Sequence, residues 1–165
     1  MRNFIIGAGM AIMAVGTALV APQGWAHHAG DTYAVGDLVV SHAWTYETSG
    51  AGHATKVYLT VMNNGDEADR LIGAAVDFAP RVGMQAQAVG ADGTLGVQDL
   101  TAIRIEPGQS LTLQPGAIWL ELEGVQRTFV DGQNFHMDLT FERAGAVEID
   151  VGVNEADEHD PDGAS

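Results

Sequence analysis

Short apolar runs that alternate with polar residues recur along most of this 165-residue chain, and turn residues separate them. Alternation with a period of two is typical of strands that bury one face. The runs lie at 37–41, 57–62, 69–75, 82–88, 135–141 and 147–153, with shorter ones around Ile103, Leu111 and Ile118. Turn signals such as Asn63-Asn64-Gly65 and Asp92-Gly93 keep the runs short. The pattern predicts an all-β domain, a Greek-key β-sandwich or barrel of about eight or nine strands.

The first 26 residues are typical of a secretory signal peptide. Met1-Arg2-Asn3 is a short basic start, residues 4–20 form an apolar run, and Gly24-Trp25-Ala26 has small residues where a signal peptidase reads. We expect cleavage after Ala26. A retained membrane anchor is the alternative, for which an apolar run of about 17 residues is short. The sequence contains no cysteine, so we expect neither disulfides nor a lipid anchor on a cysteine.

The chain is strongly acidic. It has 7 basic and 22 acidic residues and a formal net charge of −15, and loss of Arg2 with the signal peptide makes this −16. Such a charge argues against nucleic acid and anionic membrane surfaces as partners. It is compatible with cations or basic protein surfaces, although solubility of an exported protein is the simpler explanation.

Several motifs follow one another in an order that is known from one protein family. They are Gly36–Trp44 (GDLVVSHAW), Tyr58–Gly65 (YLTVMNNG), Ala68–Ala74 (ADRLIGA), Glu106–Gly108, Leu113–Gly116 and Asp138–Glu142 (DLTFE). Together they resemble the PCu(A)C family of periplasmic copper chaperones. The resemblance implies a cupredoxin-like fold, a periplasmic location and copper as the cargo. It also implies copper-receiving partners in the periplasm or anchored to the membrane, such as proteins of cytochrome oxidase assembly.

These observations divide the chain into four segments. Residues 1–26 are the expected signal peptide, 27–35 a leader, and 36–153 the PCu(A)C-like β domain. Residues 154–165 are acidic and small, a composition that predicts a disordered tail. We expect no insertion into a membrane once the signal peptide is removed.

The sequence departs from the family pattern at the copper site. Members of the family bind copper(I) with a His, a Met and a later His-x-Met pair, and such thioether and imidazole donors suit this polarisable ion. With the hairpin at Asp92-Gly93 one residue longer, Gln85 and Val97 stand at the first two positions, and Trp119 and Glu121 at the pair. Gln85 and Glu121 offer oxygen donors only, and the other two offer none. We therefore expect the inherited site to be unable to hold copper(I).

Trp119 and Glu121 alternate with Ile118, Leu120 and Leu122, which places them on the face opposite the apolar core. We expect an exposed Trp119 among acidic residues. It would serve as a protein contact or as a cover over the vacated site, or it would be a partly covered surface aromatic.

Two histidines offer a different copper site. Cleavage after Ala26 would make His27 the amino terminus, followed by His28, and a free amine with imidazoles can chelate copper(II). The arrangement is similar to the histidine brace of copper oxygenases. A flexible polar leader is the alternative. For the other histidines we expect packing or hydrogen bonding at His42, and exposure at His53, at His136 and in the tail at His159.

No pattern for an enzyme is present. The chain lacks cysteine and has neither a G-x-S-x-G nor an H-E-x-x-H motif. We expect a non-enzyme, and three hypotheses remain. The chain is a periplasmic copper-handling protein of PCu(A)C type without the usual copper(I) site, a degenerate module for protein interaction without metal, or a copper enzyme with a histidine brace.

Overall fold

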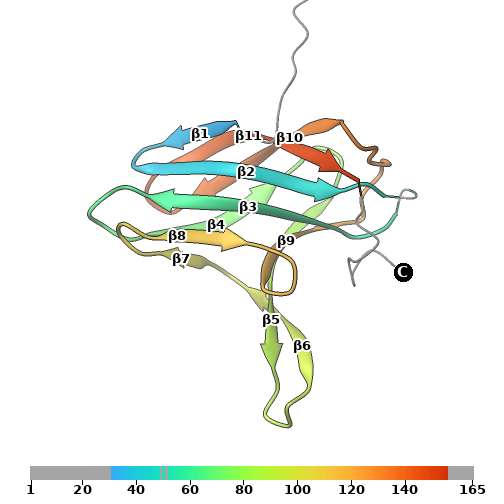
Figure 1. Cartoon of the computed structure of the whole chain (residues 1–165), viewed down its shortest axis with the longest axis horizontal. Coiled ribbons are helices and arrows are strands. Elements are labelled where there is room, and N and C mark those ends of the chain that lie inside the picture. Colours follow the sequence, from blue (N-terminus) through green and yellow to red (C-terminus); the bar gives the residue numbers. More distant parts are fainter. Residues whose placement is uncertain (1–30, 49, 51, 156–165) are drawn as a thin grey trace, which may run out of the picture.

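The computed structural model describes residues 31–48, 50 and 52–155, and every regular element in these ranges is a strand (Figure 1). The strands are β1 (Thr32–Val35), β2 (Leu38–Tyr46), β3 (Thr55–Asn63), β4 (Asp69–Ala75), β5 (Arg81–Val89), β6 (Leu95–Leu100), β7 (Ile103–Ile105), β8 (Ser110–Leu113), β9 (Ile118–Glu123), β10 (Asn134–Phe141) and β11 (Gly145–Asn154). The all-β prediction is confirmed. Two strands, β1 and β6, were not among the predicted runs. β6 is almost fully exposed and so has no apolar period, and β1 is only four residues long, with Tyr33 and Val35 partly buried against the core.

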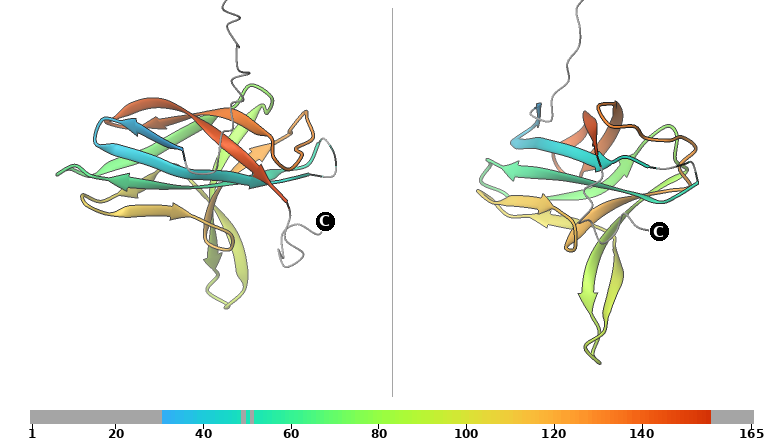
Figure 2. Two further views of the ribbon diagram at one scale, coloured as in Figure 1. Left: turned by 45° about the horizontal axis from the view of Figure 1, so that its top comes forward. Right: turned by 45° about the vertical axis from the view of Figure 1, so that its right-hand side comes forward.

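The described strands form one sheet in the order β6-β5-β9-β3-β2-β11-β10-β4-β7, with β1 beside β2 and β8 beside β3. All pairs are antiparallel except β11 with β2. Figures 1 and 2 show this sheet folded over itself into a flattened sandwich, from which the β5–β6 hairpin projects. The cupredoxin-like β-sandwich expected from the sequence is therefore present.

The core lies between the folded halves of the sheet and takes alternate residues from most strands. Its fully buried members include Leu38, Val57, Leu59, Leu71, Ile105, Leu120, Leu122, Met137, Leu139 and Phe141. Burying one such side chain stabilises a fold by about 1.5–3 kcal/mol. Because these residues are spaced by two, the same alternation fixes which residues point outward.

One extra residue in β2 changes which of its side chains point away from the core. Ser41 lies opposite Thr60 and Trp44 opposite Tyr58, so β2 uses three steps where β3 uses two. His42 sits at this β-bulge with a φ of 53°, in the left-handed region. Before the bulge the even-numbered residues face the core, and after it the odd-numbered ones do. The bulge therefore turns Trp44 to the outer face.

The hairpin that projects from the sandwich has a definite boundary. β5 pairs with β9 as far as Ala86, and beyond that β6 is its only strand partner in the described ranges. We call residues 88–98 the arm. At its tip, the Thr94 amide and hydroxyl both donate to Asp92 Oδ1, at 3.1 and 2.7 Å. These bonds lower the pKa of the Asp92 carboxyl.

Candidate functional site

The strand register brings together three of the four residues at the family's copper positions. Gln85 on β5 lies opposite Trp119 on β9, and Asp99 on β6 lies opposite Gln85 on the other side. Glu121 follows two residues after Trp119 and lies opposite Lys56 of β3. Residues that lie opposite each other in an antiparallel ladder share a face, as do residues two apart on one strand. We call this set of five the site face.

The core lies on the reverse side of the same strands. Leu120 and Leu122 of β9 are fully buried there, and Met84 of β5 is part of the same core cluster. Met84 is next to Gln85 in sequence, and for that reason it points to the opposite side. The nearest thioether in sequence is therefore directed away from the site face.

The polar atoms of the site face satisfy one another. The Trp119 indole Nε1 donates to Glu121 Oε2 over 2.6 Å, and Gln85 Nε2 donates to Asp99 Oδ1 over 3.1 Å. The Lys56 ammonium lies 4.8 Å from the centroid of the Trp119 ring, a cation–π distance. These contacts occupy the region where the resemblance places the copper ligands.

The expected exposure of Trp119 is wrong. Trp119 and Glu121 do share the predicted outward side of β9, as their hydrogen bond shows. However, only 4% of Trp119 is exposed. The Lys56 ammonium lies over the face of its ring and the Glu121 carboxylate at its edge. Alternation predicted the direction of the side chain correctly and could not predict what covers it.

Val97 is separated from the other three positions. It belongs to the arm and lies opposite Gln87 of β5. The pair of Gln87 with Val97 is the next same-face pair beyond that of Gln85 with Asp99. Its exposed fraction is 61%. The fourth family position thus shares the face of the others and presents an isopropyl group to solvent.

The donor chemistry of the site face does not suit copper(I). Its side chains offer a carboxamide, two carboxylates, an ammonium and an indole N–H, and none of these is a soft donor. Within residues 31–48, 50 and 52–155, no three His, Asp or Glu side chains come close enough together to hold a metal ion.

The described histidines lie apart from the site face. His53 is exposed in the loop before β3. His42 is exposed as well, and its Nδ1 lies 3.1 Å from Ser41 Oγ. His136 has a side chain that is 70% exposed and lies 2.8 Å from Asp150 Oδ1, while its neighbours Phe135 and Met137 are buried. The expected exposure of His53 and His136 is confirmed. His27, His28 and His159 lie outside the described residues.

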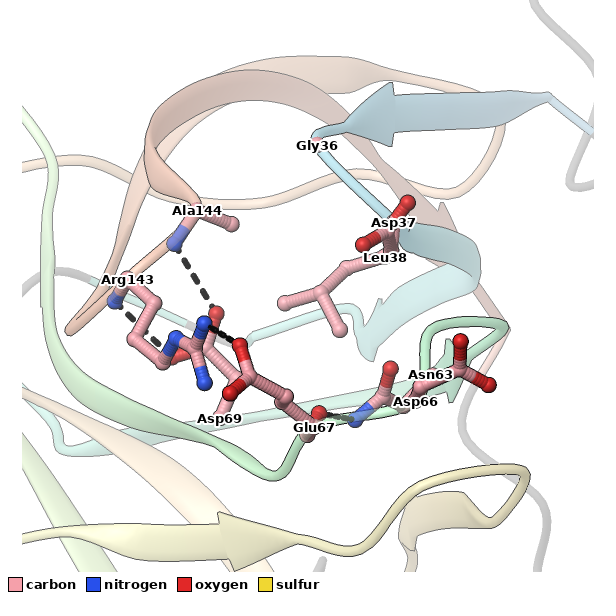
Figure 3. A pocket seen from close by; sticks show the side chains of 9 residues that line it. All are labelled: Gly36, Asp37, Leu38, Asn63, Asp66, Glu67, Asp69, Arg143 and Ala144. Atoms are coloured by element: carbon pink, nitrogen blue, oxygen red, sulfur yellow. Dashed lines mark hydrogen bonds and ion pairs between the residues drawn. The ribbon is translucent and has the colours of Figure 1, made fainter.

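A pocket that the sequence did not predict lies at the other end of β3 (Figure 3). It has a volume of about 470 Å³. Its lining comes from the β1–β2 turn, the β3–β4 connection and the β10–β11 turn: Gly36, Asp37, Leu38, Asn63, Asp66, Glu67, Asp69, Arg143 and Ala144. Figure 3 shows Arg143 and Glu67 reaching toward one another across it, where they form an ion pair.

The buried groups of this pocket hold turns together. Asp69 is 5% exposed, and its carboxylate accepts hydrogen bonds from the backbone N–H groups of Arg70, Arg143 and Ala144 at 2.7–2.9 Å. Asn63 donates from Nδ2 to the carbonyls of Glu67 and Ile105. Because the two buried polar side chains, Asp69 and Asn63, bond to backbone groups of neighbouring segments, we interpret the pocket as a place where turns are joined. The Asn-Asn-Gly turn and the Asp-Arg pair were its only signals in sequence.

The sandwich, its strand order and the β5–β9 pair that sets Gln85 opposite Trp119 define a PCuAC-type domain. The chain belongs to the family described as putative lipoprotein LpqE-like, whose profile matches residues 38–153. The resemblance inferred from the motifs is thereby confirmed.

Solved structures of PCuAC domains agree with this assignment. The copper-bound PCuAC domain from PmoF2 has 28% identity and a TM-score of 0.65, covering 76% of this chain and 99% of that domain. The apo PCuAC domain from PmoF1 has 26% identity and a TM-score of 0.67, covering 76% and 100%. The solution structure of apo-DR1885 from Deinococcus radiodurans, at 20% identity and a TM-score of 0.57 over 92% of this chain and 97% of that one, supports the fold alone.

No match was found among curated proteins. In the part of the chain that the structure describes, there is no helix of the length and apolar character needed to cross a bilayer.

Proposed function

We propose that this chain is a copper-handling protein of the PCuAC type that works in the periplasm, and that its β domain does not bind copper(I) at the family's position. The hydrogen bond between Trp119 and Glu121 carries the proposal. It joins the two side chains that replace the His-x-Met pair, so that neither is left as an available soft donor.

The positions of the methionines support this. Met84 and Met137 are core residues, with 8% and 1% of their surface exposed. Met62 lies at the β3–β8 pair, where its sulfur accepts a hydrogen bond from Ser110 at 3.1 Å. No small change of side-chain conformation would bring a described thioether to Gln85 or Trp119, because Met84 is on the reverse side of the sheet.

Copper that the exported protein carries would then be copper(II) at its amino terminus. After cleavage at Ala26, the α-amine and imidazole of His27 with the imidazole of His28 would supply nitrogen donors. The recipients would be copper proteins of the periplasm or of the membrane surface, including those of cytochrome oxidase assembly.

The test is a copper titration of the exported protein, with mass spectrometry to define its amino terminus. We expect a start at His27, no stoichiometric copper(I) in competition with bicinchoninate, and one copper(II) by electron paramagnetic resonance. Replacing His27 and His28 together by Ala should abolish the copper(II) signal. Stoichiometric copper(I) that survives this double substitution would contradict the proposal, and a different amino terminus would remove the terminal site.

A second candidate function is a module for protein interaction without metal. It is favoured by the half-buried Trp44 and Tyr46, which follow the β2 bulge on the outer face. Trp44 lies 4.9 Å from Tyr46 and 4.6 Å from the buried Tyr58 between ring centroids. Absence of both copper(I) and copper(II) binding would leave this function. Turnover of oxygen with a reductant would be needed to support a histidine-brace enzyme instead.

A further inference from the structure

The arm exposes apolar side chains on one of its faces. Val89 and Leu95 lie opposite each other near the tip, and each is 69% exposed. Val97 follows two residues after Leu95 on the same face and is 61% exposed. These three contribute little to the core, and Figures 1 and 2 show the hairpin standing clear of the sandwich. Neighbouring exposed apolar side chains of this kind are typical of contact surfaces.

The strand beside them is an open edge. β6 ends the strand order and pairs with β5 alone among the described strands. Along Leu95–Leu100 the outer N–H and C=O groups are therefore available for another strand. Proteins usually block such an edge with Lys or Pro, and β6 contains neither. An unblocked edge next to apolar side chains fits the addition of an extended strand.

The charges around the arm indicate which kind of partner strand would pair with β6. Residues 82–100 contain Asp92 and Asp99 but no Lys, Arg or His. Two cations lie near its base, and both already have partners: Arg81 forms an ion pair with Glu123 at 3.0 Å, and the Lys56 ammonium lies over the Trp119 ring. A second copy of this chain would bring another net charge of −15 to the same edge. The negative potential of the protein would repel such a second copy. The same potential would attract a partner rich in Lys or Arg and favour its binding.

We propose that the arm binds an extended segment of a partner protein, one that alternates apolar residues and carries basic residues at its ends. The segment pairs with the edge of β6, and its apolar side chains cover Val89, Leu95 and Val97. This inference goes beyond the proposed function and does not require copper.

The test uses the exported protein and a fluorescent synthetic peptide of alternating Val and Thr with Lys at both ends. We expect saturable binding by anisotropy that weakens with salt, together with slowed amide exchange in β6. The substitutions Leu95→Ser and Val97→Ser together should weaken binding at least about tenfold. Ile72→Ser, at an exposed apolar residue of β4, is the matched control and should not change it.

Three results would overturn the proposal. The first is equal affinity for the parent protein and for the variant with Ser at 95 and 97. The second is equal binding of a peptide with Glu in place of Lys, or of one with a central Pro that blocks strand pairing. The third is sedimentation showing a dimer that the same two substitutions dissolve, because the occupant would then be a second copy. Copper titration of the same variants should be unchanged, which separates failure here from failure of the proposed function.

Discussion

Trp119 donates its indole N–H to Glu121 over 2.6 Å, and both side chains lie on the outward side of β9. A distance this short is typical of a bond to a charged acceptor. The Lys56 ammonium lies on the face of the same ring. The indole is thus held at its edge by an anion and on its face by a cation, which explains how a large aromatic side chain is buried on the outer side of a sheet.

Trp119→Phe keeps an aromatic ring, although a smaller one, and removes the donor. Because the Glu121 carboxylate is only partly accessible to water, we expect a loss of about 1–3 kcal/mol in the free energy of unfolding. Urea denaturation measures this. Trp44→Phe is the control, since the contacts of Trp44 are ring packing with Tyr46 and Tyr58. Equal losses in the two variants would show that the bond to Glu121 contributes nothing specific.

The backbone under the family positions should still support copper(I). Gln85 and Trp119 remain directly opposite each other, with Glu121 two residues on. We therefore expect the combined substitutions Gln85→His, Val97→Met, Trp119→His and Glu121→Met to create stoichiometric copper(I) binding in competition with bicinchoninate. The parent protein is the control. A folded variant without copper(I) binding would show that the backbone has changed along with the side chains.

The carboxylate of Asp69 should be essential for stability. It accepts three backbone hydrogen bonds from two turns and is almost fully buried. Asp69→Ala leaves three donors without a partner, so we expect a loss of at least about 2 kcal/mol in the free energy of unfolding. The control is Asp66→Ala, an exposed residue of the same pocket, which should change little. Similar thermal midpoints for both variants would contradict this account.

The tip of the arm should respond to acid. The Thr94 hydrogen bonds lower the pKa of Asp92 below its ordinary value, so the charged form is favoured in the folded tip. The resulting stabilisation is complete above the ordinary carboxyl pKa and is lost as pH falls through the lowered one. We expect the protection factor of the Thr94 amide, the exchange rate of an unstructured amide at the same pH divided by its own, to fall over that acidic range. Thr94→Ala should return the pKa of Asp92 toward its ordinary value, as measured by NMR titration, and an unchanged pKa would refute the assignment.

The bulge in β2 can be tested at His42. A φ of 53° is open to Gly and disfavoured for β-branched residues. His42→Gly should be neutral or stabilising, whereas His42→Val should cost about 1–2 kcal/mol of unfolding free energy. The His42 side chain is exposed, so the comparison isolates the backbone. If the two variants were equally stable, the left-handed conformation would not constrain this position.

The period of two was sufficient to predict most of this fold. Runs such as 135–141 and 147–153 correspond to β10 and β11. One face of each strand is buried, so the apolar residues of the run are those that point toward the core. β6 was missed for the opposite reason, since its residues 95–99 are exposed and 100 is only partly buried. The hairpin turn at Asp92-Gly93 was its only signal.

The site was predictable in part. The face shared by Trp119 and Glu121 followed from alternation along one strand, and their hydrogen bond agrees with it. The contacts of Gln85 with Asp99, and of Lys56 with Trp119, join strands that are distant in sequence. Such pairings depend on register across the sheet, which a single sequence does not specify. Burial of Trp119 was mispredicted for the same reason.

The free-standing arm also affects how related sequences should be compared. Residues inserted or deleted near its tip would lengthen or shorten the hairpin without disturbing the sandwich at its base, where Gln85 lies opposite Trp119. Counting residues from position 85 to position 97 therefore measures the length of a hairpin that is free to vary. Matching such chains by their strand partners at the base identifies equivalent positions more securely than matching them by spacing.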